Sequence, residues 1–326
     1  MPKALQFEEL FCFCFLQKKM INFVNNSRQV INETNVQEKP KYSKFSGFIK
    51  LTKLRLSLLV VFSAVITYLT TSNNFNFNVF WTLTVGGLLI TSSANAFNQI
   101  IERDLDLLMN RTMKRPLPLK LLTPVESTLF AFVCGIAGVW LMFEFTNTLC
   151  GILSILSIFL YSVVYTPMKR VTPFSVFLGA IPGALPTLIG GIASTEGFGE
   201  ITLHSLLLFS IQFFWQFPHF WAIAWVLHDD YQKAGFFMLP SSGGRDQSSK
   251  FQILVYTLFL IPISLTPCLF GFAGMVSAII ILICSLLFFF QAYQLLKTGD
   301  VSDARKLMFG SFVWLPVVQL ILMFGI

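Results

Sequence analysis

Three oxygen-bearing side chains recur at four-residue intervals near the end of the second apolar run. Asn98, Glu102 and Asp106 occupy positions i, i+4 and i+8, which on a helix puts them in one row along one face. Two carboxylates and an amide suit a hard cation such as Mg²⁺, which also takes phosphate oxygens. The alternative is a solvated helix end with incidental charges. The cost of polar groups at membrane depth argues against that alternative.

Basic residues follow this row with no acidic residue among them. Arg111, Lys114 and Arg115 come directly after it, and Lys169 and Arg170 stand two apolar runs later. Taken alone, such residues indicate an anchor at the membrane surface. Placed after a cation site, they suit a metal-bound polyanion such as diphosphate, because the planar Arg fork matches phosphate oxygens.

A third group combines aromatic rings, a histidine and another acid. Trp215 and His219 lie inside an apolar run, Asp230 stands just after its end, and Tyr165 precedes Lys169 by four residues. Asp230 has a depth similar to that of the first acidic row, which predicts it as a further metal ligand. Two interpretations of His219 stay open: a histidine hydrogen-bonded to a neighbouring helix, or a ligand of a haem iron or partner of a carboxylate.

Long apolar runs must position these groups. The chain has 326 residues, of which 55% are hydrophobic and 12% charged, about half the charged share of a soluble domain. Runs of roughly 18–25 apolar residues match a helix that crosses the hydrocarbon core. We therefore predict an all-α polytopic membrane protein with nine transmembrane helices. The predicted spans are 54–72, 79–99, 125–145, 148–166, 174–194, 203–227, 252–270, 272–294 and 307–325.

The basic residues predict the orientation of these spans. All 23 Lys and Arg residues fall on one side of the nine-span arrangement, and the positive-inside rule makes that side cytoplasmic. The N-terminus and the acidic loops are then cytoplasmic, and the C-terminus lies outside. The net charge of +7 therefore indicates topology rather than nucleic-acid binding. The six cysteines have no zinc or redox spacing and are interpreted as small apolar residues.

Residues 1–44 are predicted to form a loosely ordered cytoplasmic extension before a membrane domain over residues 45–326. The extension contains one arginine, Arg28, and four glutamates. A mitochondrial transit peptide would be rich in arginine and poor in acidic residues. This composition favours the bacterial plasma membrane over the mitochondrial inner membrane.

Four motifs lie within residues 45–326: Asn98-x-x-x-Glu102-Arg103-Asp104-x-Asp106, Tyr165-Thr-x-x-Lys169-Arg170, Trp215-Gln-x-Pro-His219 and Asp230-Tyr231. They resemble the motifs of the UbiA-type intramembrane prenyltransferases, and in particular of the branch that acts on haem. The resemblance implies a nine-helix bundle around a cytoplasm-facing cavity that opens sideways to lipid. It also implies Mg²⁺-dependent transfer of a farnesyl group from farnesyl diphosphate to a vinyl group of haem b. The product would be haem O, which is used in assembling haem-copper oxidases.

The resemblance also implies a role for each candidate residue. The substrates would be haem b and farnesyl diphosphate, the surroundings the lipid bilayer, and a downstream haem A synthase a candidate partner. The expected roles are catalysis and Mg²⁺ binding by Asn98, Glu102, Asp106 and Asp230; diphosphate binding by Arg111, Lys114, Arg115, Lys169 and Arg170; and haem contact by His219, Trp215 and Tyr165.

Two departures from the family pattern and two alternatives accompany this resemblance. Glu102 stands where the family usually has Asp, and Ser175 stands where many members have Asn. One alternative is a prenyltransferase of the same fold that acts on a quinone precursor or another aromatic acceptor. The other is a secondary transporter, in which intramembrane carboxylates and broken helices also occur. The clustering of acidic and basic residues at one membrane face favours the enzyme.

Overall fold

The structure, a computed structural model, describes residues 43–326. Within these residues nine helical segments are long and apolar enough to cross a membrane, and no residue is in a strand. The predicted all-α fold with nine spans is therefore confirmed. The segments are α2–α3 (Lys44–Thr52 and Leu54–Thr71), α4 (Phe77–Ile101), α6 (Pro124–Phe145), α7–η1–α8 (Thr148–Phe159, Leu160–Tyr165 and Thr166–Met168), α9 (Ser175–Ile192), α10 (Leu203–Val226), α12 (Gln247–Leu269), α13 (Met275–Thr298) and α14 (Val301–Phe324).

The predicted N-terminal extension falls almost entirely outside this range. Residues 1–42 lie outside the described residues. The prediction of a loosely ordered tail over residues 1–44 and of a domain beginning at residue 45 therefore stays a prediction.

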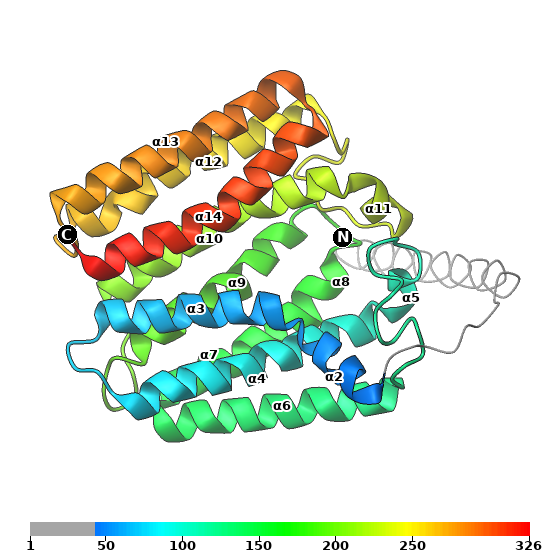
Figure 1. The fold of residues 1–326 in the computed structure, drawn as a ribbon, viewed down its shortest axis with the longest axis horizontal. Helices are drawn as coiled ribbons and strands as arrows, with labels where there is room; N and C mark the ends of the chain where they lie inside the picture. Colours follow the sequence, from blue (N-terminus) through cyan, green and yellow to red (C-terminus); the bar gives the residue numbers. More distant parts are fainter. Residues whose placement is uncertain (1–42) are drawn as a thin grey trace, which may run out of the picture. The chain divides into compact units, whose positions relative to one another are not determined.

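Helices that follow one another along the chain pack side by side, and the last returns to the first. α4 packs on α6, α9 lies between α3 and α10, and α14 contacts α10, α13 and α3 (Figure 1). Across the last of these contacts the Ser63 hydroxyl donates to Gln319 Oε1 at 3.3 Å, and Gln319 Nε2 donates to Gln212 Oε1 at 2.9 Å. The described helices thus close into a ring in which α3 meets α14.

Small residues allow the closest of these contacts. A Cβ on Gly138 of α6 would lie 3.0 Å from the carbonyl oxygen of Gly86 on α4, and a Cβ on Gly190 of α9 would collide with the Ala64 carbonyl of α3. Close backbone approach at glycine is typical of helix packing in membranes, where dispersion contacts replace the hydrophobic effect. These contacts hold α3 against α9 and α4 against α6. The acidic row begins at the end of α4.

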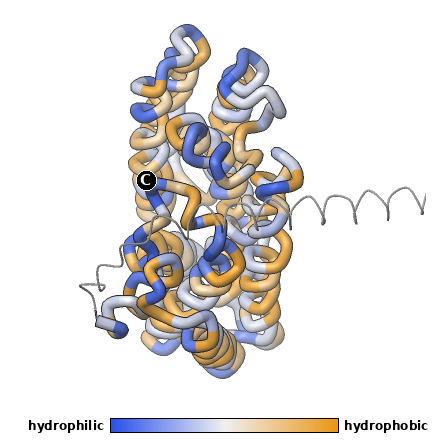
Figure 2. The backbone as a smooth tube through the Cα atoms, turned by 90° about the vertical axis from the view of Figure 1, so that its right-hand side faces the viewer, coloured by the Kyte–Doolittle hydropathy of each residue, from blue (hydrophilic) through white to orange (hydrophobic). Residues whose placement is uncertain are grey.

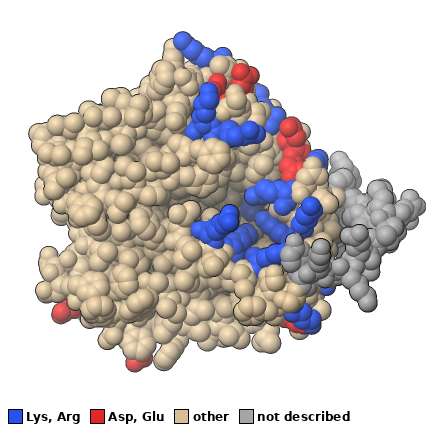
Figure 3. Space-filling model, in the orientation of Figure 1, with Lys and Arg blue, Asp and Glu red and all other residues tan. Residues whose placement is uncertain are grey.

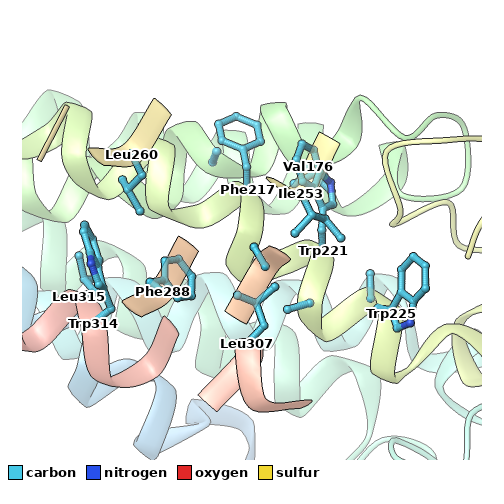
Figure 4. Close-up of a cluster of buried hydrophobic side chains, with 14 of the residues drawn as sticks. Val176, Phe217, Trp221, Trp225, Ile253, Leu260, Phe288, Leu307, Trp314 and Leu315 are labelled. Atoms are coloured by element: carbon cyan, nitrogen blue, oxygen red, sulfur yellow. The ribbon is translucent and has the colours of Figure 1, made fainter. Parts of the chain in front are cut away.

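Large aromatic residues fill the second half of the bundle. Trp221 and Trp225 of α10, Phe288 of α13 and Trp314 of α14 are at least 95% buried and belong to one cluster (Figure 4). Within the bilayer, such rings stabilise the packing through many small dispersion contacts. The cluster fixes α10, and with it the short helix that follows α10.

The outer surface is largely apolar. Leu129, Ile136, Leu287 and Val313 are each 61–68% exposed, and exposed apolar patches of this extent are foreign to soluble proteins. Figure 2, viewed from the end that carries α5 (Arg103–Asp106) and α11 (His228–Lys233), shows hydrophilic turns in front of hydrophobic helices. The chain is therefore a multi-pass membrane protein.

Three backbone irregularities occur at this same end. Lys53 is left-handed, with φ 47° and ψ 51°, between α2 and α3. Glu102, with φ −89° and ψ 2°, separates α4 from α5. The end of the fourth span is the π-helix η1. Such departures from regular helix concentrate at functional sites.

Candidate active site

The acidic row predicted on one helix lies instead across two. α4 ends at Ile101, and α5 begins at Arg103. Hydrogen bonds nonetheless continue at four-residue spacing, from Glu102 N to the Asn98 carbonyl at 3.0 Å and from Asp106 N to the Glu102 carbonyl at 2.8 Å. Asn98, Glu102 and Asp106 are 2%, 4% and 0% exposed. The break thus leaves the row continuous and buried.

Each oxygen-bearing side chain of the row has a basic partner. We call these six residues the paired cluster. Burial strengthens such charge-assisted contacts, because there is little water to screen them. The pairs are Lys53 Nζ to Asn98 Oδ1 at 3.1 Å, Lys169 Nζ to Glu102 Oε1 at 2.5 Å, and an Arg115 terminal nitrogen to both Asp106 oxygens at 2.8 and 2.7 Å.

The π-helix directs the fourth span into this cluster. Thr166 N bonds to the Tyr161 carbonyl across the wider turn, and the Thr166 hydroxyl also donates to that carbonyl at 2.8 Å. The same hydroxyl accepts from Asn98 Nδ2 at 3.1 Å. Lys169 Nζ lies 4.7 Å from the centre of the Tyr165 ring, within range of a cation–π interaction.

Asp230 links the short helix after α10 to the loop that follows the acidic row. On α11 (His228–Lys233) its carboxylate accepts from the backbone N–H groups of Asn110 and Arg111 at 3.0 and 3.1 Å and from Lys233 Nζ at 3.0 Å. Partial burial raises the pKa of the Asp230 carboxyl, but these donors outweigh it and hold the pKa below its usual value. Asp230 therefore fastens α11 to the loop that carries Arg111.

The predicted diphosphate residues divide into two groups. Lys169 and Arg115 belong to the paired cluster, whereas Arg111 and Lys114 are exposed and Arg170 is half-buried. The Arg111 guanidinium lies 5.7 Å from the centre of the Tyr231 ring. Figure 3 shows Lys and Arg side chains gathered at this end of the molecule. A buried cationic centre thus has a basic rim.

The residues predicted to contact haem are not all together. The His219 ring stacks on Trp215 with 4.4 Å between centroids, and its Nδ1 lies 2.7 Å from the Ser311 hydroxyl of α14. Trp215 Nε1 donates to the Ser311 carbonyl at 2.9 Å. Tyr165 instead lies beside Lys169. His219 and Trp215 thus form a packed unit with α14, and Tyr165 belongs with the paired cluster.

An apolar cavity of about 100 Å³ lies between α3, α4, the fourth span and α9. Its wall includes Leu56, Ile90 and Pro186, together with the polar side chains of Asn95 and Tyr161. Tyr161 is also within electrostatic reach of Lys169 and Glu102. The cavity therefore offers apolar space close to the ionic centre.

Two residues of the site, Lys53 and Thr166, were not predicted from the sequence. Lys53 is one of ten basic residues within positions 1–55, all of which were interpreted as topology signals. Thr166 is part of the Tyr165-Thr-Pro motif but carries no charge. One feature of the sequence could have singled out Lys53. It stands where the first predicted span begins, and this is the same side of the membrane on which the second span ends.

The oxygen donors fit a hard divalent cation. Mg²⁺ usually takes one or two protein carboxylates and completes its shell with water and phosphate oxygens, which agrees with Glu102, Asp106 and the amide of Asn98. Within residues 43–326 no three His, Cys, Asp or Glu side chains form a metal-binding group. The remaining positions around such an ion would be filled by water or phosphate oxygens.

Comparison with known families decides the relationship of this chain. The sequence profile of the UbiA prenyltransferase family matches residues 58–315. The chain belongs to this family. The resemblance inferred from the motifs is confirmed, and a UbiA family member is a prenyltransferase rather than a secondary transporter.

Curated relatives narrow the position within the UbiA family. A protein of Cytophaga hutchinsonii is 45% identical over 282 residues, covering 85% of this chain and 96% of its own. A protein of Christiangramia forsetii is 43% identical over 288 residues, covering 86% and 94%. Both carry the name protoheme IX farnesyltransferase.

Solved structures share the UbiA fold. Digeranylgeranylglyceryl phosphate synthase superimposes with a TM-score of 0.72 at 19% identity, over 86% of this chain and 98% of its own. A UbiA homologue from Archaeoglobus fulgidus, bound to GPP and Mg²⁺, superimposes with a TM-score of 0.63 at 13% identity, over 85% and 99%. At these identities the likeness establishes the fold.

Proposed function

We propose that this chain transfers the farnesyl group of farnesyl diphosphate to a vinyl group of haem b, giving haem O. The observation that carries the proposal is the paired cluster beside an apolar cavity, in a UbiA family member whose relatives at 43–45% identity are named for this reaction. The ionic centre suits the diphosphate, and the cavity suits an isoprenoid chain.

We assign metal binding to the side chains of the acidic row. Asn98, Glu102 and Asp106 would hold Mg²⁺, with Asp230 as a further ligand or as the residue that positions the adjacent loop. When bound, Mg²⁺ would neutralise charge on the diphosphate oxygens. A magnesium-bound UbiA homologue supports the use of a divalent cation in this family.

The basic residues would assist the departure of the diphosphate. Lys169 and Arg115 would bind the diphosphate oxygens at the centre, with Arg111, Lys114 and Arg170 at the rim. As the bond between the farnesyl carbon and the diphosphate oxygen breaks, negative charge grows on the leaving group, and fixed cations stabilise it most at that moment. The terminal vinyl carbon of haem b then supplies the electron pair for a bond to the farnesyl carbon. The cation left on the vinyl carbon next to the porphyrin ring takes up a water molecule and releases a proton, which gives the hydroxyl group of haem O.

The allylic cation formed in this step must be kept from water. The apolar wall between α3, α4 and α9 would exclude water from the farnesyl chain. No nucleophile of the protein is required. His219 and Trp215, with Tyr165 nearer the ionic centre, are our candidates for haem contact.

The proposed setting is the bacterial plasma membrane. The N-terminus would be cytoplasmic and the C-terminus outside, which places the paired cluster at the cytoplasmic face. A haem A synthase acting on the product is the proposed downstream partner. The one-sided distribution of Lys and Arg supports this orientation.

The test is product analysis with the full-length protein purified in detergent. Incubation with haem b, farnesyl diphosphate and Mg²⁺ should give farnesylated haem by mass spectrometry, and excess EDTA should prevent its formation. Unchanged haem together with prenylation of a supplied quinone precursor would overturn the acceptor assignment. Equal product in EDTA would overturn the metal assignment.

A further inference from the structure

Every oxygen donor of the acidic row is matched one-to-one by a cation from another part of the chain. Lys53 comes from the junction of α2 and α3, Arg115 from the loop after α5, and Lys169 from the end of the fourth span. Arg115 and Lys169 were expected to bind diphosphate, but Lys53 has no assigned role. The contact of Lys53 with Asn98 suggests that Lys53 also has a role in the site.

The backbone at Lys53 is held in a conformation that lysine rarely adopts. Its φ of 47° lies in the left-handed region, which is disfavoured for residues with a Cβ. α2 is fixed on one side by Gly47, which packs against Leu122. The surrounding contacts therefore maintain a turn that directs Lys53 inward.

The amide of Asn98 is oriented by its other neighbours. Asn98 Nδ2 donates to the Thr166 hydroxyl, whose own hydrogen is given to the Tyr161 carbonyl. The Asn98 oxygen is thereby turned toward Lys53 Nζ. A metal ion that takes this oxygen must displace the ammonium group from it.

The charges of the paired cluster favour joint arrival of two ions. With all five groups ionised, three cations and two carboxylates give the cluster a net charge of +1, and Lys53 is within electrostatic reach of all four other charged members. A divalent cation alone would raise this charge to +3 in a poorly screened site. Adding a diphosphate ester with about three negative charges near neutral pH would bring it to zero.

We propose that Lys53 is a further diphosphate-binding residue, and that Lys53, Lys169 and Arg115 occupy the donor oxygens until metal and diphosphate arrive together. The three cations then transfer from the row to the diphosphate oxygens, while the metal takes the row. The inference rests on the proposed function in one respect, namely that the anion is a diphosphate. It predicts opposite effects of Lys53 on the two ions.

The test measures the two ions separately on full-length protein in detergent. Mn²⁺ alone is titrated by electron paramagnetic resonance, and inorganic diphosphate with Mg²⁺ is titrated by calorimetry. Lys53→Gln should bind Mn²⁺ alone several-fold more tightly, because Asn98 is released, and should bind magnesium diphosphate about tenfold more weakly. Lys53→Arg should retain diphosphate binding.

Lys44→Gln is the matched control. It removes the same charge from the same segment, but Lys44 pairs with Glu126 at the surface, with its side chain 67% exposed. It should change neither affinity. Lys53→Asn serves as a second variant, since asparagine tolerates the left-handed backbone, and thermal unfolding of each variant verifies folding.

The outcomes separate this inference from the proposed function. Weaker binding of both ions by folded Lys53→Gln would reduce Lys53 to a support for Asn98 and overturn the inference. Unchanged diphosphate binding would overturn it as well. A wild-type protein that binds no magnesium diphosphate would overturn the proposed function itself.

Discussion

Asp106 is the most enclosed charge of the paired cluster, and its loss should be severe. In the wild-type protein the Arg115 guanidinium donates to both carboxylate oxygens of Asp106. Asp106→Asn leaves this guanidinium without a counter-charge in a buried place. Breaking a buried pair from one side costs about 3 kcal/mol. We expect turnover to fall by about 100-fold or more and the melting temperature to fall with it, measured by product formation and thermal unfolding.

Asp300→Asn is the control for this change. Asp300 precedes α14, is exposed and makes no side-chain cap bond. It should leave turnover and melting temperature nearly unchanged. Equal losses in Asp106→Asn and Asp300→Asn would mean that overall charge, not a defined site, controls activity.

Glu102 tests the length of the acidic arm. Glu102→Asp restores the usual family residue but shortens the side chain by about 1.5 Å, so the 2.5 Å contact with Lys169 cannot form in place. We expect measurable activity with a higher Mg²⁺ requirement. Glu102→Gln removes the charge and should be far less active at every Mg²⁺ concentration. Rates across a Mg²⁺ titration check both, and identical curves for the two variants would refute the prediction.

Asp230 predicts a specific dependence on pH. Because its pKa in the folded protein is lower than usual, its stabilising contacts are fully present above the unfolded value of about 3.9. They are lost as pH falls through the folded value. The difference in melting temperature between wild type and Asp230→Asn should therefore stay constant from pH 7.5 to pH 5. A difference that already shrinks between pH 7 and pH 6 would contradict this.

At the scale of elements, the π-helix η1 depends on a glycine of the neighbouring helix. A Cβ on Gly179 of α9 would lie 2.7 Å from the Tyr165 ring. Gly179→Ala should push Tyr165 and Lys169 away from the row, at an overpacking cost of about 1–3 kcal/mol, and lower the rate more than the amount of folded protein. Val163→Ala, on the same turn but 57% exposed, should be near neutral. Specific activity per folded protein distinguishes the two.

The elements were more predictable than their breaks. Apolar runs determine a membrane helix through local composition, so all nine spans were recognisable. The left-handed Lys53, the interruption at Glu102 and the π-turn arise where helices from distant sequence positions meet, and residue types alone do not specify such backbone angles. The row and its basic neighbours could be foreseen as chemistry. That each acid would be paired with its own cation could not, because the pairs join residues up to 67 positions apart.

At the scale of the whole molecule, the orientation in the membrane can be tested by labelling. In a cysteine-free background, Glu196→Cys, in the turn after α9, should react with an impermeant thiol reagent in intact cells. Met113→Cys and Gln232→Cys, at the opposite end, should react only after the cells are permeabilised. All three positions are exposed. Labelling of Met113→Cys from outside would reverse the orientation and move the proposed site to the other face.

The contact between α3 and α14 also bears on how the protein is made. α14 is synthesised after the other crossing helices that the structure describes, yet it supplies Gln319 to the hydrogen bonds that join α3 and α10. Until α14 enters the bilayer, α3 can pack on α4 and α9, but the Ser63 hydroxyl and the Gln212 side chain lack the hydrogen-bond partner that Gln319 provides. Release of the chain before α14 would therefore leave these polar groups of α3 and α10 without that partner, so the first described crossing helix has its full set of contacts only after the last one has been inserted.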